Sequence, residues 1–191
     1  MTTPRRRRRP GLERLMKAAD ELLYAEGIAR TGVQRILEEA DVARGTLYGN
    51  FASKDELVEA YLAQRHEGTL AAIVEQVGDA TAPQEVFEAF LAVGERRSSA
   101  DGFRGCAFSL AVAEIPDEGG VARRWAATHK TTLKRMLVES LGARADADDV
   151  AEELMVLYDG ALLSAALRPG AGSFAAARRA GRSVLADGGV R

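Results

Sequence analysis

The sequence has few of the residues that build metal centres and disulfides. Its 191 residues include one cysteine and two histidines, which excludes an internal disulfide and a zinc site built from several cysteines. No run approaches the roughly 18 to 20 apolar residues of a membrane span, and no charged segment followed by an apolar one, as in a secretory signal, opens the chain. We therefore expect a cytoplasmic protein with no membrane contact, no metal and no cofactor.

The motifs of the common enzyme classes are also missing. Helical-bundle oxidases need Glu-x-x-His pairs on facing helices, but the residues at that spacing before His66 and His129 are alanines. The chain has no Walker loop, dinucleotide-binding glycine motif, metalloprotease motif or Gly-x-Ser-x-Gly elbow. These absences argue against an enzyme, and an all-helical enzyme remains only as an alternative.

Strand patterns are absent as well. Hydrophobic residues make up 47% of the chain and charged residues 28%, as in ordinary globular proteins. Apolar residues recur at helical spacing along the whole chain rather than alternating. The sequence predicts an all-α fold of about nine helices.

What the sequence does contain is a pair of short helices between Thr31 and Phe51. The first helix has one apolar stripe at i, i+3, i+4 and i+7, formed by Val33, Ile36, Leu37 and Ala40. Asp41 interrupts the stripe, and Leu47 anchors the next helix against the same core. The outward face of that helix carries Arg44, Gly45, Thr46, Tyr48, Gly49 and Asn50. Such side chains approach phosphates or hydrogen-bond to base edges, which predicts a helix-turn-helix DNA-binding unit, although similar pairs also occur in helical proteins that bind no DNA.

This block resembles the DNA-binding region of the TetR family of bacterial transcriptional regulators. The matching residues are Thr31, Gly45, Thr46, Leu47, Tyr48, Phe51, Ser53, Lys54, Asp55, Glu56 and Leu57. Many members carry histidine where this chain has Asn50, so no rule that links this position to an operator sequence transfers. The resemblance implies that Tyr48 and Lys54 hold phosphates and that Arg44, Gly45 and Thr46 face the bases, with Thr31 included in the DNA-binding set.

The charge of the chain is unevenly distributed. The net charge is −2, but residues 1–66 contain 12 basic and 10 acidic residues against 14 and 18 in the remainder. Five of the basic residues form one run: Arg5, Arg6, Arg7, Arg8 and Arg9. Because Pro4 and Pro10 flank the run and disfavour helix, residues 1–11 are expected to form a disordered arm. The arm either stays solvated or contacts DNA in the minor groove or at phosphates.

The helical pattern predicts three parts after the arm. Residues 12–57 would form the DNA-binding domain, with Ser53 and Glu56 as a capping box that starts a connecting helix over 53–77. Residues 78–191 would form a C-terminal domain for effector binding and dimerisation. Its helices are expected at about 83–97, 103–115, 121–141, 148–167 and 173–186.

Aromatic and other apolar residues of the C-terminal domain are candidates for an effector pocket. They are Phe87, Phe90, Phe103, Cys106, Phe108, Trp125, His129, Met136 and Tyr158. Periodicity alone also fits a solid core, but regulators of the resembled family generally bind an effector here, and the stretch 102–114 resembles a C-terminal subtype within the family. His129 is the polar candidate, with Trp125 one turn before it and Glu114 nearby in the sequence. Cys106 is expected to be a small buried hydrophobe, and redox sensing by it is left open.

The last two helices are candidates for a dimer interface because they are rich in small apolar residues. The set is Leu154, Leu157, Ala161, Leu162, Ala165, Phe174, Ala177 and Val184. The resemblance implies a four-helix interface between two subunits, and the alternative is that these helices form the core of a monomer. A two-fold dimer would join two weakly binding domains into one specific DNA-binding unit.

Together these observations predict a homodimeric, TetR-type repressor that binds double-stranded DNA. We expect a small, largely apolar effector, not yet identified, to release it from a near-palindromic operator. The alternative is a non-sensing DNA-binding protein with a solid C-terminal core. Repression and activation both remain open.

Overall fold

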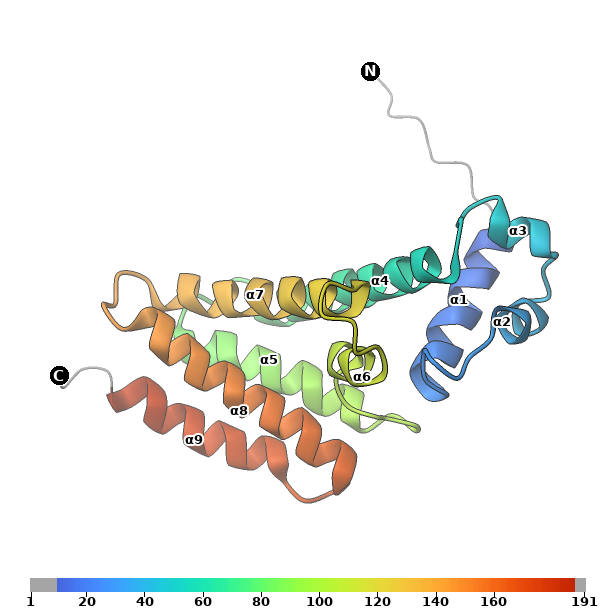
Figure 1. The fold of residues 1–191 in the computed structure, drawn as a ribbon. Coiled ribbons are helices and arrows are strands. Elements are labelled where there is room, and N and C mark those ends of the chain that lie inside the picture. The colour runs from blue at the N-terminus through green and yellow to red at the C-terminus, as the bar shows by residue number, and fades with distance from the viewer. Residues whose placement is uncertain (1–9, 188–191) are drawn as a thin grey trace.

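The computed structural model describes residues 10–187, which form nine α-helices and no strand (Figure 1). The helices are α1 (Pro10–Ala25), α2 (Val33–Ala40), α3 (Arg44–Tyr48), α4 (Lys54–Val77), α5 (Pro83–Ser98), α6 (Ala107–Glu114), α7 (Val121–Leu141), α8 (Ala147–Leu167) and α9 (Ser173–Asp187). The all-α prediction is confirmed. Within residues 10–187, no helix has both the length and the apolar character needed to cross a membrane.

Helices α1 to α3 form the N-terminal domain, at the right of Figure 1. Helix α1 begins at Pro10, earlier than expected, because proline suits the first helical position, where its missing N–H is not needed. The guanidinium of Arg14 donates from Nε to the carbonyl of Ala40 (3.1 Å) and from Nη2 to that of Asp41 (3.0 Å). These bonds fix α1 against the end of α2, where Asp41 adopts the left-handed conformation (φ 49°).

Helix α4 connects the N-terminal domain to the rest of the molecule. It begins at the expected capping box: Ser53 Oγ accepts from the backbone N–H of Glu56 (3.2 Å), and the Glu56 carboxylate accepts from the N–H of Ala52 (2.7 Å). In Figure 1 it runs from the N-terminal domain along α5 and α7, which it also contacts. Helix α4 is therefore in contact with both parts of the molecule.

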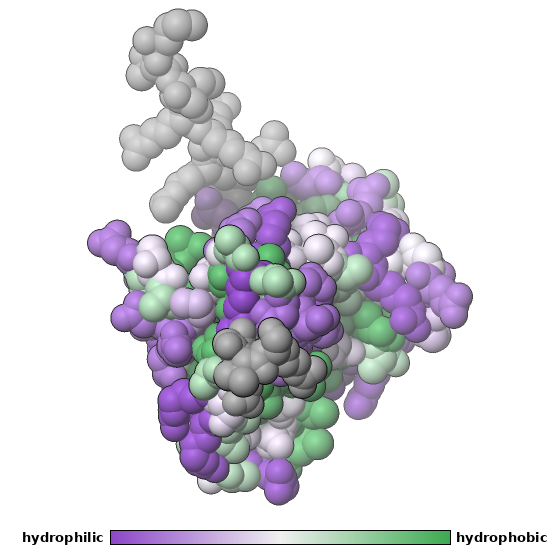
Figure 2. Space-filling model, turned by 90° about the vertical axis from the view of Figure 1, so that its left-hand side faces the viewer, coloured by the Kyte–Doolittle hydropathy of each residue, from purple (hydrophilic) through white to green (hydrophobic). Residues whose placement is uncertain are grey.

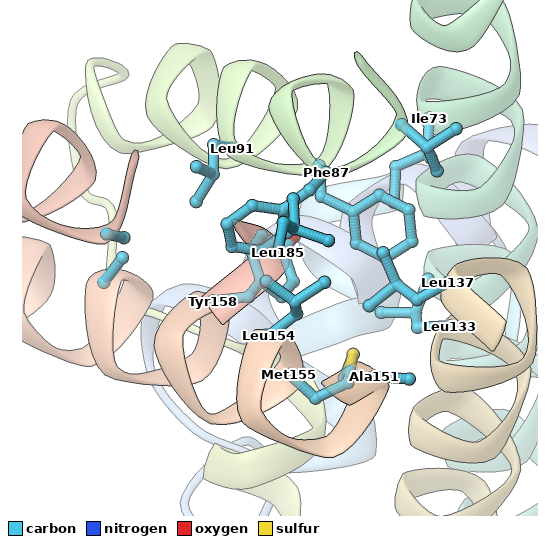
Figure 3. Close-up of a cluster of buried hydrophobic side chains, with 14 of the residues drawn as sticks. Ile73, Phe87, Leu91, Leu133, Leu137, Ala151, Leu154, Met155, Tyr158 and Leu185 are labelled. Carbon is cyan, nitrogen blue, oxygen red and sulfur yellow. The ribbon is translucent and has the colours of Figure 1, made fainter. Parts of the chain in front are cut away.

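The C-terminal domain is built around one apolar cluster with side chains from α4, α5, α7, α8 and α9. Figure 3 shows Phe87 and Tyr158 in this cluster, together with leucines of α5, α7, α8 and α9. Gly94 of α5 allows the close packing, because a Cβ there would lie 2.8 Å from a ring carbon of Phe174 and 3.1 Å from one of Tyr158. A larger residue at Gly94 would force these rings or α5 itself to shift.

A second apolar cluster does not follow the expected domain boundary at residue 78. It contains the core of the N-terminal domain together with Phe108 and Ala111 of α6 and Ala122 of α7. Cys106, just before α6, packs against both clusters and is only partly buried. Helix α6 therefore links the two domains directly, in addition to α4.

Candidate nucleic-acid interface and ligand cavity

The outward face of α3 is the candidate nucleic-acid interface. Leu47 is fully buried beneath it, whereas Tyr48 is 51% exposed. Arg44, Gly45 and Gly49 are also exposed, and Thr46 and Asn50 are partly buried. A five-residue helix with one buried anchor thus presents all its other side chains outward or to its edges, the arrangement that base and phosphate contacts require.

Two hydrogen bonds involve side chains of this face. Arg44 Nη2 donates to Oε1 of Gln34 on α2 (3.3 Å), so Gln34 is an exposed amide beside the face that sequence reasoning did not single out. The Asn50 side chain donates to the carbonyl of Thr46 (2.7 Å). Asn50 therefore helps to terminate α3 as well as lying at its edge.

Two residues of the predicted DNA-binding set have structural partners instead. Thr31 is 1% exposed, and its hydroxyl donates to the carbonyl of Gly27 (2.7 Å). The Thr31 side chain therefore points into the N-terminal domain and is not part of the outward face of α3. Lys54 donates from Nζ to the carbonyl of Ile28 (2.6 Å) and is partly buried. Both residues hold the segment between α1 and α2, and the predicted Arg5 to Arg9 contacts lie outside the described residues.

A cavity of about 490 Å³ lies between α1, α4 and the C-terminal helices. It is lined by five of the predicted effector residues, which are Phe103, Cys106, Phe108, His129 and Tyr158. The other four predicted residues do not line it. Phe87 and Phe90 belong to the core of the C-terminal domain and Met136 packs against it, while Trp125 packs against the N-terminal cluster.

The cavity is more polar than the sequence suggested. Its additional polar and charged lining residues are Asp20, Tyr24, Gln64, Arg65, Thr69, Arg97, Asp101 and Lys130. Arg65 makes two hydrogen bonds to the Asp20 carboxylate, at 2.5 and 2.9 Å, and lies 4.3 Å from the centre of the Tyr24 ring. Asp20 and Tyr24 belong to α1, so the cavity includes residues of the N-terminal domain that sequence reasoning had assigned to DNA binding alone.

His129 lines this cavity, but its surroundings differ from those expected. Its Nδ1 lies 3.1 Å from Nδ1 of His66 on α4, and its ring stacks on Phe108 with 3.9 Å between the centroids. Burial, together with the positive charges of Lys130, His66 and Arg97, lowers the pKa of His129 to about 3. The ring is therefore neutral at ordinary pH. Glu114, which is nearby in the sequence, accepts from the backbone N–H of Ala29 (3.2 Å).

Polar contacts next to the cavity join α1 to the segment before α6. The Tyr24 hydroxyl accepts from the backbone N–H of Arg104 (2.8 Å) and donates to the carbonyl of Gly105 (2.9 Å). Arg104 Nη1 in turn donates to the carbonyl of Tyr24 (2.6 Å). These residues are 80 and 81 positions apart in the chain, and no local sequence pattern indicates the pairing.

All eight side chains predicted at a dimer interface pack within the subunit. Leu154, Ala161, Leu162, Phe174 and Ala177 are buried, and Leu157, Ala165 and Val184 are partly buried in the same cluster. The exposed apolar residues of α8 are instead Val156 (63%), Leu163 (61%) and Leu167 (72%). Figure 2, a view onto the end of the domain where α7 meets α8, shows hydrophilic and hydrophobic residues mixed over that end.

Two sequence models of known families match this chain. The one described as "Bacterial regulatory proteins, tetR family" matches residues 15–61, which include α2 and α3. The one described as "BetI-type transcriptional repressor, C-terminal" matches residues 111–188.

The chain is also similar to two curated regulators. It is 43% identical over 53 residues to TtgR of Pseudomonas putida, and 40% identical over 68 residues to YvkB of Bacillus subtilis, an uncharacterised regulator. These matches cover 28% and 36% of this chain and only 25% and 35% of those relatives.

Solved structures resemble the chain over nearly its whole length. A TetR-family transcriptional regulator from Streptomyces coelicolor is 32% identical with a TM-score of 0.85, over 93% of this chain and 95% of that one. The regulatory protein TetR from Rhodobacter sphaeroides is 24% identical with a TM-score of 0.76, over 91% and 98% of the two chains. The second likeness concerns the fold alone.

Proposed function

The chain belongs to the TetR family of DNA-binding transcriptional regulators, and from this premise we propose that it is a repressor that a small molecule releases from its operator. The observation that carries the proposal is a ligand-sized cavity lined by residues of both the N-terminal domain and the C-terminal domain. A ligand in such a place touches the DNA-binding domain itself. It is therefore able to favour one position of that domain over another.

The outward face of α3 is the proposed DNA contact. Arg44, Gly45 and Thr46 would meet base edges in the major groove, and the exposed Tyr48 would bind a phosphate. Lys54 would act mainly through the carbonyl of Ile28, holding the segment before α2. Its ammonium has two further N–H donors that remain available for a phosphate.

A dimer that uses α8 and α9 would place two such faces on one operator. The exposed residues Val156, Leu163 and Leu167 lie 7 and 4 residues apart along α8, which puts them on one side of the helix. This stripe replaces the buried set as the proposed interface. Two half-sites must match major grooves about 34 to 36 Å apart or a multiple of that distance, so small displacements of one domain reduce operator affinity.

The cavity also argues against a non-sensing protein. A protein that binds no effector has no need of such a space between its two domains, and about 490 Å³ falls within the range of small-molecule sites. Phe103, Phe108 and Tyr158 form an apolar part of the cavity wall, which suits the small, largely apolar effector expected from the sequence. The polar residues of α1 and α4 supply groups that orient a ligand.

The test begins with selection of DNA fragments by the purified full chain, followed by footprinting. We expect the retained fragments to share a near-palindromic sequence that the dimer protects. Small molecules are then screened for loss of the protein–operator complex. Retained fragments with no common sequence would contradict operator recognition, and an operator complex that no cavity-bound compound weakens would contradict effector release.

A further inference from the structure

Arg97, in the last turn of α5, lines the cavity without an acidic partner. Its Nη1 donates to Oγ1 of Thr69 (2.6 Å) and its Nη2 to the carbonyl of Gly68 (3.2 Å), both on α4. These acceptors are neutral, and Arg97 takes part in none of the ion pairs formed within residues 10–187. The guanidinium is thus oriented by two hydrogen bonds while its charge is uncompensated.

The other cations of the cavity are already paired. Arg65 binds the carboxylate of Asp20, and Lys130 binds that of Asp159. The remaining lining carboxylate, Asp101, is exposed on the loop after α5. A cationic ligand would have to compete with Arg65 for Asp20 and would also face Arg97, whereas an anion meets an available positive charge.

The charges around Arg97 also favour an anionic ligand over a cationic one. Although part of its side chain is exposed, burial of the guanidinium lowers its pKa, and the nearby charges of Arg65 and Arg96 lower it further. No carboxylate is among the groups that shift the pKa of Arg97. Because arginine keeps its proton in proteins, a bound anion would find at Arg97 a positive charge that no carboxylate neutralises.

The cavity that Arg97 lines also has an apolar wall. Phe103, Phe108, Tyr158 and Leu162 line the same space. We propose, building on the effector function above, that the cavity binds an aromatic organic anion whose carboxylate or sulfonate pairs with Arg97 and whose ring packs against Phe103, Phe108 and Tyr158. A planar, two-pronged guanidinium suits such an acid group better than a single ammonium would.

The test uses two fluorescent probes that share one ring system, the anion anilinonaphthalene sulfonate and its neutral parent phenylnaphthylamine. Both are titrated into the full-length protein and into three variants, R97Q, R97K and R96Q. Arg96 is the matched control: it is the next residue on the same helix, it has the same charge, and it bonds to Gln76 outside the cavity. Circular dichroism and operator binding confirm that each variant is folded.

We expect the anion to bind more tightly than the neutral probe. R97Q should weaken anion binding about tenfold or more, the effect of losing a hydrogen bond to a charged group, and leave the neutral probe unaffected. R97K should have an intermediate effect and R96Q none. Equal losses in R96Q and R97Q, or an anion affinity unaltered in R97Q, would overturn the proposal while leaving the effector site intact. Failure of both probes to bind the wild-type protein would overturn the proposed aromatic-anion site, whereas the effector function is decided separately by the operator screen described above.

Discussion

His66 of α4 and His129 of α7 face each other with their Nδ1 atoms 3.1 Å apart. One ring must donate and the other accept, so at least one of them is neutral in this contact. His129 is buried and stacked on Phe108, while His66 is partly exposed and also lies 5.6 Å from the ring of Trp125. The pair therefore joins the helix that carries the DNA-binding domain to the wall of the cavity.

This pair predicts an acid-sensitive fold. The pKa of His129 is lowered to about 3 in the folded protein, chiefly by burial, from about 6.5 in the unfolded chain. Its neutral form contributes stability that is fully present above pH 6.5 and is lost as the pH falls towards 3. Between pH 7 and pH 5 this loss amounts to about 2 kcal/mol. Urea unfolding of wild type and H129Q at both pH values, at one fixed protein concentration, measures it.

The H129Q variant should lose about 2 kcal/mol less than wild type over that interval, even if it is less stable at pH 7. Carboxylates that titrate in the same range contribute equally to both proteins and cancel in the comparison. If both proteins lose the same stability on acidification, His129 is not the buried neutral group inferred here.

The sequence was sufficient to predict the helices, because each has its own local signal. Ser53 and Glu56 fixed the start of α4, and the spacing of Ile36, Leu37 and Ala40 fixed the inner face of α2. Such signals say which side of a helix is buried. They do not say which distant helix covers it.

That limit explains why the polar lining of the cavity and the exposed side of α8 were not predicted. The cavity depends on pairings such as Asp20 with Arg65, 45 residues apart, and Tyr24 with Arg104, which no periodicity reports. In α8, large apolar residues occur on both the inner side, as at Leu154, and the outer side, as at Leu163. A helix that is apolar on most sides gives no indication of which residues meet a second subunit.

Substitutions on α3 should separate phosphate contacts from base contacts. Tyr48→Ala should weaken binding to all DNA sequences by a similar factor, because a phosphate contact carries no sequence information. Arg44→Ala and Thr46→Val should change which operator variants are preferred, by roughly 1 to 3 kcal/mol for a well-formed base contact. Binding assays on a panel of operator variants, with Arg135→Ala of α7 as control, measure both effects. Preferences that stay unchanged in the Arg44 and Thr46 variants would place the base contacts elsewhere.

Removal of residues 2–9 should make DNA binding weaker and less dependent on salt. Without the five arginines of this segment, residues 1–66 contain seven basic and ten acidic residues, so the domain loses its positive balance. Each phosphate that the segment neutralises contributes a slope of about −0.9 to log affinity against log salt concentration. The slope should therefore become less negative by up to about 4 to 5 per subunit. A version with five lysines should retain the wild-type slope, and an equal slope in the deleted protein would show that the segment does not bind DNA.

The exposed stripe of α8 should be required for dimerisation. Val156→Glu combined with Leu163→Glu places two like charges on each subunit, and burial of unpaired charges in an interface is strongly unfavourable. We expect monomers by sedimentation analysis and at least tenfold weaker operator binding, with unchanged helix content. Val74→Glu is the matched control, because Val74 is also exposed (59%) but lies on α4. A double variant that remains dimeric would move the interface to another surface.

The Tyr24 hydroxyl should hold α1 to the segment before α6. Tyr24→Phe removes the acceptor for the N–H of Arg104 and the donor to the carbonyl of Gly105. The free energy of unfolding should fall by about 1 to 3 kcal/mol because a partly buried backbone N–H loses its partner. Tyr61→Phe is the control, since the Tyr61 hydroxyl makes no hydrogen bond within residues 10–187. Amide hydrogen exchange at Arg104 should accelerate in the Tyr24 variant alone. Equal exchange in both variants would mean that the two domains are joined through α4 and the apolar contacts of α6, without help from this hydroxyl.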